Sequence, residues 1–550
     1  CRRGDIDRPL AIRAMKRFLV EWHAASGIPD VAPEITPRAE SVAVIGAGPG
    51  GLAAAMLLAS SGVRVTVFEK DGVVGGRTRT VTAPGGYRFD IGPTFFLYPR
   101  ILAEIFEACG ARLEDEVDLI RLDPQYRLVF EGAKPVTIDA TPDLARMEAE
   151  VAKINPADAA GVRSFMAENR VKLEAFRPVL ERPFHGVMTY LAPEVMNGLK
   201  HLRPWLSLDQ ELQRHFSDPR TRLAFSFQSK YLGMSPFRCP SMFSILSFLE
   251  YEHGVFHPRG GCGVVSEAMA RVAESVGVDI RLNTKVDRIV FEGRRAVGVE
   301  AGGRLHAADA VVVNADFAHA IPGLMEEEQR PQWPDKKIAE ARYSCSTFML
   351  YLGIEGELDL AHHTVLLAED YENNLAQIES GIIPQNPSLY VQAAAGTDPS
   401  LAPPGHSTLY MLVPVPNLLG GADWATEAPR YRRLALDRLK ALGLTDIESR
   451  IRYEKILSPQ DWRDEYAVGY GATFNLAHNV RQMMHFRPRN RFGKARGVYL
   501  VGGGTHPGSG LPVIYEGARI STDLLLQDLG LARSERSPRH MRASESVSGD

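Results

Sequence analysis

Three glycines and an acid near the beginning of the chain have types and spacing that suit nucleotide binding. Gly46, Gly48 and Gly51 follow an apolar run, and Glu69 ends a second apolar run. In a β-α-β unit the first glycine permits a tight turn, the second lets backbone approach a pyrophosphate, and the third allows close helix packing. N–H groups at the helix start then face the phosphates, and the acid can accept hydrogen bonds from ribose hydroxyls. The order therefore predicts a dinucleotide site.

The residues after Glu69 favour FAD over a nicotinamide cofactor. Gly75, Gly76 and Arg77 form a GGR loop just past the second predicted strand. This loop resembles that of glutathione-reductase-like flavoproteins, in which it runs beside the FAD pyrophosphate and ribityl chain. Nicotinamide dehydrogenases need no such loop, so we expect Gly76 and Arg77 to contact FAD.

A second glycine-rich stretch lies near the end of the chain. Residues 497–529 read as a strand, a glycine-rich turn and a helix with Pro512 in its first turn, where proline is well suited. The positive end of this helix would stabilise negative charge on a reduced flavin. The further residues that we expect at FAD are Gly92, Pro93 and Thr94, which form a turn after a strand, together with Val286, Gly503, Gly504, Gly510, Leu511 and Pro512.

Length and composition limit the class of protein. At 550 residues the chain exceeds a single compact core, so two domains are expected. The formal net charge of −4 gives no general attraction to nucleic acid. No uninterrupted apolar run reaches the roughly 18 residues of a spanning helix, which predicts a soluble or peripheral protein.

The cysteines argue against a metal site and against a disulfide framework. All five stand singly, without the paired spacing of metal or redox motifs, and their number is odd. A reducing, cytoplasmic location is therefore the expectation.

The pattern of runs and turns predicts an α/β fold in which a Rossmann FAD-binding domain of the glutathione-reductase type is discontinuous in sequence. A mixed α+β substrate domain completes it. The expected division is an N-terminal extension (1–40), the FAD-binding domain (41–115, 255–320 and 490–531), a substrate- and membrane-associating domain (116–254 and 321–489), and a disordered tail (532–550).

Ten ordered sequence blocks between residues 41 and 530 resemble bacterial-type phytoene and carotenoid desaturases, which belong to the flavin amine oxidase superfamily. Among them are FDIGPT (89–94), GVFHPRGG (254–261) and YLVGGGTHPGSGLP (499–512). The resemblance implies an FAD-dependent enzyme that inserts double bonds into a linear polyene, with phytoene converted towards neurosporene or lycopene as the first expectation. It also implies peripheral binding to the inner face of the membrane, because the substrate dissolves in bilayers. A quinone or oxygen would accept the electrons, and a homo-oligomer is left open.

Desaturation removes a hydride and then a proton from the neighbouring carbon, so it needs a base. The candidates are His506 and Glu516, which flank the C-terminal glycine loop, and His363 of the AHHT motif. Some members of the family carry an Arg-Asp pair in a helical substrate segment, but the corresponding VMTYLAP (187–193) has neither residue. Either such a pair has no acid/base role here, or the substrate differs from that of those members.

Four alternatives stay open at this point. The chain could be a thirty-carbon diapophytoene desaturase or a carotenoid oxidase of the same family. A flavin amine oxidase shares the two-domain plan, but its aromatic cage is not evident in the sequence. A flavoprotein that binds carotenoids without catalysis would also keep the FAD motifs.

Overall fold

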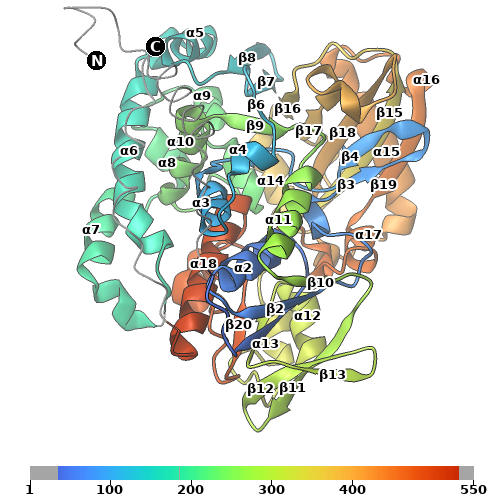
Figure 1. The fold of residues 1–550 in the computed structure, drawn as a ribbon. Coiled ribbons are helices and arrows are strands. Elements are labelled where there is room, and N and C mark those ends of the chain that lie inside the picture. Colours follow the sequence, from blue (N-terminus) through green and yellow to red (C-terminus); the bar gives the residue numbers. More distant parts are fainter. Residues whose placement is uncertain (1–34, 185, 532–550) are drawn as a thin grey trace, which may run out of the picture. The chain divides into compact units, whose positions relative to one another are not determined.

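The computed structural model describes residues 35–184 and 186–531 (Figure 1). The first 34 residues of the expected N-terminal extension and the whole expected tail, 532–550, lie outside the described residues. Within the described ranges, no helix is long and apolar enough to cross a membrane.

A five-stranded parallel sheet assembles from distant parts of the chain. Its order is β10 (Asp279–Arg281), β2 (Arg64–Phe68), β1 (Ser41–Ile45), β14 (Ala310–Val313) and β20 (Val498–Leu500). The expected strand-turn-helix units therefore meet in one sheet, although more than four hundred residues separate β1 from β20. The fold is mixed α/β with a parallel sheet, as the sequence predicted.

Alternate side chains of this sheet enter two different cores, as the period of two in a strand requires. Val42, Val44 and Val312 pack with helices α2 (Pro49–Ala59), α11 (Gly263–Ser275) and α18 (Leu511–Asp528). On the other face, Ala43 and Val311 pack with the antiparallel sheet β11–β12–β13 (Val286–Glu292, Arg295–Ala301, Arg304–Ala307) and with α12 (Phe317–Leu324). Both faces are covered, which explains why these strands read as continuous apolar runs.

The second large sheet of the fold has seven strands. Its order is β19 (Ile451–Leu457), β15 (Ser346–Glu355), β18 (His406–Val415), β17 (Leu389–Gln392), β16 (His363–Leu367), β7 (Tyr126–Phe130) and β8 (Val136–Ala140). Only the β16–β7 pair is parallel. Helix α15 (Trp424–Arg438) packs on one face through Trp424 and Tyr431.

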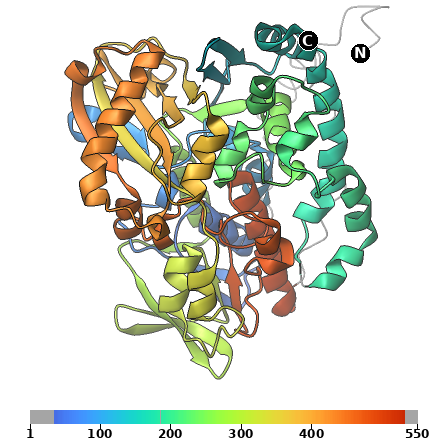
Figure 2. The same cartoon turned by 180° about the vertical axis from the view of Figure 1, so that it is seen from behind.

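Helices make up most of the segment from 144 to 253. They are α5 (Leu144–Ile154), α6 (Gly161–Leu180), α7 (Pro193–Leu202), α8 (Leu208–Leu212), α9 (Pro219–Ala224) and α10 (Ser244–His253), which are coloured teal to green in Figures 1 and 2. The Asp143 carboxylate caps α5 by accepting a hydrogen bond from the Arg146 N–H at 3.0 Å.

Smaller elements connect these layers. Two minor sheets are β3–β4 (Thr80–Thr82, Arg88–Asp90) and β5–β9–β6 (Phe96–Leu97, Val255–Pro258, Leu119–Arg121). The β6–β9 pairing crosses the expected boundary at 115/116. The remaining α-helices are α3 (Arg100–Ala108), α4 (Leu113–Glu116), α13 (Asp335–Glu340), α14 (Tyr371–Glu379), α16 (Ile447–Arg450) and α17 (Pro459–Asp464).

Candidate functional site

The glycine loop between β1 and α2 leaves no room for a side chain at its first and third glycines. Gly46 has φ +96°, and a Cβ there would lie 2.4 Å from the Asn314 carbonyl oxygen. A Cβ on Gly51 would lie 2.1 Å from the Gly46 carbonyl oxygen. The first and third glycines therefore serve backbone packing, as the sequence predicted.

Glu69 follows β2 and holds its carboxylate beside this loop. The side chain is buried, and its Oε2 accepts a hydrogen bond from the Ala47 N–H at 2.7 Å, while Oε1 accepts one from the Asp71 N–H at 3.0 Å. These two bonds fix the direction of the carboxylate at the edge of a cavity that Glu69 also lines. Its remaining lone pairs can accept from ribose hydroxyls.

A cavity of about 800 Å³ joins most of the residues that the sequence assigned to FAD. Gly46, Gly48, Glu69, Gly76, Arg77, Gly92, Pro93, Thr94, Val286, Gly503, Gly510, Leu511 and Pro512 line it. Gly51 and Gly504 do not, because Gly51 packs against the loop backbone and a Cβ on Gly504 would meet Phe317 and Asn475. Contact of the lining residues with a cofactor stays a prediction.

Two helices begin at this cavity with their first N–H groups uncapped by side chains. Gly48 is the N-cap of α2, and Gly510, with φ +104°, is the N-cap of α18, whose first turn holds the predicted Pro512. Free N–H groups and the helix dipole make each end favourable for negative charge. One cavity thus offers two places for anionic groups, which suits a pyrophosphate and an electron-rich ring.

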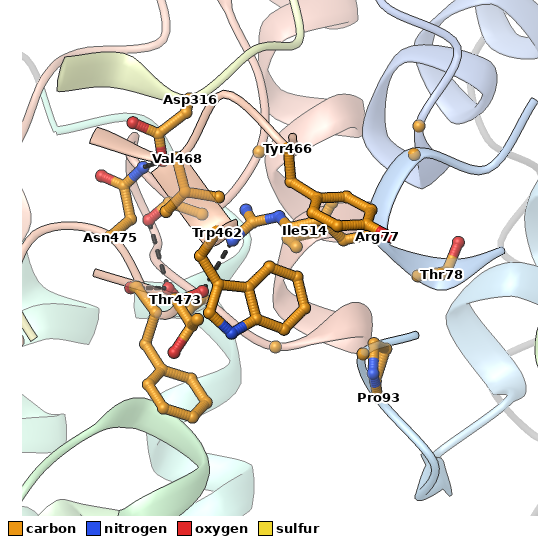
Figure 3. A pocket seen from close by; sticks show the side chains of 18 of the residues that line it. Arg77, Thr78, Pro93, Asp316, Trp462, Tyr466, Val468, Thr473, Asn475 and Ile514 are labelled. Atoms are coloured by element: carbon orange, nitrogen blue, oxygen red, sulfur yellow. Dashed lines mark hydrogen bonds between the residues drawn. The ribbon is translucent and has the colours of Figure 1, made fainter. Parts of the chain in front are cut away.

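Arg77 extends from the GGR loop to a distant segment of the chain (Figure 3). Its Nη1–H donates to the Thr473 carbonyl oxygen at 2.7 Å. Close by, Asp316 accepts from the Asn475 amide at 2.7 Å; burial raises the pKa of the Asp316 carboxyl, and Arg77 opposes this rise. The Thr473 hydroxyl oxygen is buried and lacks a hydrogen-bond partner among the described residues. A bound ligand could supply that partner.

The other end of the cavity is apolar, and the seven-stranded sheet forms one of its walls. Alternate residues on one sheet face line it: Thr347 and Met349 on β15, Tyr410, Leu412 and Pro414 on β18, Tyr390 on β17, and Val365 and Leu367 on β16. Phe95, Phe227, Leu246 and Leu249 line it too. A long apolar chain could lie against such a surface.

None of the three predicted bases lines this cavity in the described structure. His506 is buried with its Nε2 at 3.1 Å from the Arg182 carbonyl oxygen, and burial lowers its pKa to about 4. Glu516 accepts from Arg519 at 3.2 Å in a buried ion pair. Both side chains therefore bond to structural partners, although the sequence placed them at the reacting centre.

His363 lies directly behind the cavity wall. Its Nδ1 is 2.7 Å from the Tyr390 hydroxyl, and its ring stacks on Phe95 with centroids 4.0 Å apart. Tyr390 also shares a hydrogen bond of 2.7 Å with the Thr94 hydroxyl, and both Tyr390 and Thr94 line the cavity. Burial holds the pKa of His363 well below its usual range, so the imidazole is neutral. Thr94, Tyr390 and His363 form a continuous hydrogen-bonded series that begins at the cavity.

Four residues that line the cavity were not predicted from the sequence: Tyr390, Tyr410, Trp462 and Thr473. The alternation of Tyr410, Leu412 and Pro414 along the apolar run that forms β18 was the available signal, because these residues share a sheet face. Tyr390 and Tyr410 have ring centroids 5.8 Å apart at 64°. The structure therefore places an aromatic pair at the cavity although none was evident from the sequence.

One cluster outside the cavity has metal-ligand chemistry. Glu168, Glu211 and His215 bring possible ligand atoms within 4.8 Å of one another. The Lys172 ammonium donates to Glu211 at 2.6 Å, and Arg203 contacts both carboxylates. The cations already compensate the acids, so the cluster is an ion-pair network.

Comparison with known proteins gives one matching family and several similar proteins that are named desaturases. A family model for flavin containing amine oxidoreductases matches residues 49–523. The chain is 42% identical over 494 residues to the 4,4'-diapophytoene desaturase (4,4'-diapolycopene-forming) of Methylomonas sp, covering 88% of this chain and 95% of that protein. It is 40% identical to the all-trans-zeta-carotene desaturase of Myxococcus xanthus, with 89% and 94% covered. It is 36% identical to the neurosporene-forming phytoene desaturase of Rhodobacter capsulatus, with 86% and 91% covered.

A solved structure shares the fold. An oxidoreductase from Methanosarcina mazei superposes with a TM-score of 0.57 at 19% identity, covering 87% of this chain and 99% of that one. At this identity the likeness concerns the fold alone.

Proposed function

This chain belongs to the family of flavin containing amine oxidoreductases, and from that membership we propose that it is an FAD-dependent desaturase of linear polyenes in carotenoid biosynthesis. Phytoene, converted towards neurosporene or lycopene, is the first candidate substrate. Diapophytoene is the second candidate, supported by the 42% sequence identity to a 4,4'-diapophytoene desaturase.

The observation that carries the proposal is the continuity of one cavity. It begins at the glycine loop and Glu69 and continues to the apolar sheet face of Val365, Leu367 and Leu412. A dinucleotide and a hydrocarbon chain can therefore share one continuous space. This is the arrangement that oxidation of an apolar C–H bond by a flavin requires.

The residues at the polar end fit FAD. Glu69 would accept from the ribose, the N-terminus of α2 would face the pyrophosphate, and the N-terminus of α18 at Gly510 would face the flavin. When bound, FAD supplies a two-electron acceptor for a hydride from the substrate. We infer a Rossmann FAD-binding domain of the glutathione-reductase type around it, with a quinone or oxygen as final electron acceptor.

The apolar wall would position the polyene and keep water from the reacting carbons. Loss of a proton beside the cationic carbon completes the double bond, and we infer that Tyr390 receives this proton. As its oxygen takes up the substrate proton, its own proton passes to His363 Nδ1 at 2.7 Å. The neutral state of His363 leaves a nitrogen free for this role. Of the three bases expected from the sequence, His363 is thus the one that we retain.

We also infer peripheral membrane binding at the inner face. Four exposed apolar side chains gather along the segment that contains α7: Met188, Leu191, Met196 and Trp205, the last 70% exposed. The exposed Lys200 lies in the same helix and could contact anionic headgroups. Exposed apolar groups beside a basic helix end suit a lipid surface from which a bilayer-soluble polyene would enter.

Expression in hosts that accumulate either forty-carbon phytoene or thirty-carbon diapophytoene tests the function, with the pigments identified by chromatography. Coloured polyenes in either host are expected, together with a flavin spectrum of the purified protein. Flavin without product in both hosts would refute the desaturase and leave a carotenoid oxidase, an amine oxidase or a binding protein.

A further inference from the structure

A second cavity, of about 510 Å³, lies behind the apolar end of the first one. Tyr371 is the only residue in the described part of the chain that lines both cavities. It is the first residue of α14, which follows β16, and its side chain is 5% exposed. Tyr371 therefore lies between the two spaces and is the partition between them.

The two sides of this partition differ in polarity. Towards the first cavity, the neighbouring lining residues are Leu367, Leu375 and Leu389, with Asn374 and Ser388, which bond to each other, as the polar residues beside them. Towards the second, they include Asp209, Arg222, Glu369, Asp370 and Glu372. Hydrocarbon is favoured on the first side, whereas charged side chains that need water or polar partners occupy the second. The apolar path therefore ends at Tyr371.

The position of the partition is fixed by hydrogen bonds of α14. The Asp370 carboxylate caps the helix by accepting from the Asn373 N–H at 3.1 Å. The Asn374 side chain donates to the Asn386 carbonyl and accepts from the Ser388 N–H, both at 3.3 Å. These bonds hold the start of α14 against the segment that leads into β17.

The register of the sheet places this partition away from the Thr94–Tyr390 hydrogen bond. Tyr390 is opposite Val365 in the β17–β16 pair, and Leu367 lies two residues further along β16. With strands about 4.8 Å apart and a rise of about 3.3 Å per residue, Tyr390 and Leu367 are roughly 8 Å apart. Tyr371 comes four residues after Leu367 in the sequence, and both residues line the first cavity. The apolar path therefore continues from Tyr390, the expected reacting centre, to Tyr371.

We propose that Tyr371 is the end stop for the polyene and thereby a determinant of the chain length that the enzyme accepts. This inference rests on the proposed function. A chain whose end meets the ring has a defined carbon beside Tyr390, whereas a chain of another length has a different carbon there. Tyr371 is a positioning residue and takes no part in the chemistry.

The test compares purified, FAD-loaded wild type with Tyr371→Ala and Tyr371→Trp on phytoene and diapophytoene in detergent or liposomes. The measured quantity is the ratio of kcat/KM for the forty-carbon over the thirty-carbon substrate. Tyr371→Ala joins the two cavities and should raise this ratio about tenfold, the scale on which apolar pockets discriminate small differences in size. Tyr371→Trp places a larger side chain at the end of the apolar path and should lower this ratio of kcat/KM values.

Glu372→Gln is the matched control, because Glu372 is the next residue of α14 and lines only the second cavity. A ratio within twofold of wild type in the Tyr371→Trp variant, or in both variants, would overturn the end stop. If only Tyr371→Ala fails to fold, Tyr371→Trp alone decides. Wild type that converts neither polyene would instead refute the proposed function, so the two failures are distinguishable.

Discussion

Replacing Glu69 tests the adenine end of the site most directly. A carboxylate that accepts from a ribose hydroxyl makes a charge-assisted bond worth about 1.5–3 kcal/mol. Since about 1.4 kcal/mol is a factor of ten in Kd, Glu69→Ala should weaken FAD binding roughly 10- to 150-fold. Glu69→Gln keeps one acceptor oxygen and should stay near the lower limit.

The same substitution has a second, separate effect on the apoprotein. Glu69 accepts from the Ala47 and Asp71 N–H groups at 2.7 and 3.0 Å, so alanine leaves two N–H groups without their acceptor. Each such group costs about 1–3 kcal/mol when buried. The bond from Ala47 is buried, whereas the bond from Asp71 is only partly buried. The free energy of unfolding of the apoprotein should therefore fall in Glu69→Ala by at least about 1 kcal/mol, the lower limit for the buried group alone.

Two measurements separate these effects. Titration of deflavinated protein with FAD, followed by flavin fluorescence, gives Kd, and urea unfolding without FAD gives stability. Glu292→Gln is the control, since Glu292 is an exposed acid on β11 that does not line the cavity. An FAD Kd within twofold of wild type in Glu69→Ala would refute the assignment of Glu69 to the cofactor.

Four further predictions concern the loop, the proton path, acid stability and the membrane surface. Gly46→Ala should destabilise the fold by about 3 kcal/mol or more, because strain at positive φ adds to a contact of 2.4 Å with Asn314; Gly277→Ala, at φ +94° with open space around it, should cost only about 1–2 kcal/mol in urea unfolding. Tyr390→Phe should lower kcat about 100-fold without loss of FAD, and a change under threefold would show that the proton leaves by another route. The folded-state pKa of His506, about 4, lies below the usual 6.5, so the unfolded chain binds more protons between these values. The contribution of His506 to stability should fall as the pH is lowered through this window, by about 2 kcal/mol from pH 7 to pH 5, so a His506→Asn variant should lose less stability than wild type over this range; the same pH dependence in both would contradict this. Leu191→Ser combined with Trp205→Ser should reduce sedimentation with anionic liposomes at least tenfold, since each side chain contributes about 1.5–3 kcal/mol of apolar burial; Leu305→Ser, an equally exposed leucine on β13, should bind as wild type does.

The sequence by itself determined the parts of this protein whose causes are local. The spacing of Gly46, Gly48 and Gly51 predicts the first turn, and the backbone permits no side chain at Gly46 or Gly51. The same holds for the helix that begins after Gly510. The ends of the parallel strands follow from short apolar runs, and the structure confirms them.

Only the tertiary structure decided which polar groups face the cavity. Arg77 and Thr473 are bonded across 396 residues, and no local pattern encodes such a pair. His506 and Glu516 stand in the glycine-rich segment that predicted the flavin end, yet their side chains turn to Arg182 and Arg519. Since the direction of a side chain depends on the neighbours that the fold supplies, segment position alone could not show this.

The apolar path likewise depends on the packing of segments that are distant in the sequence. Tyr390, Val365 and Tyr371 belong to three elements that become neighbours only when β16 and β17 pair and α14 is capped beside them. The sequence determined that FAD and an apolar ligand should be bound. The packing of distant strands decided where the apolar wall lies and which hydroxyl lines the cavity beside it, because both depend on long-range contacts.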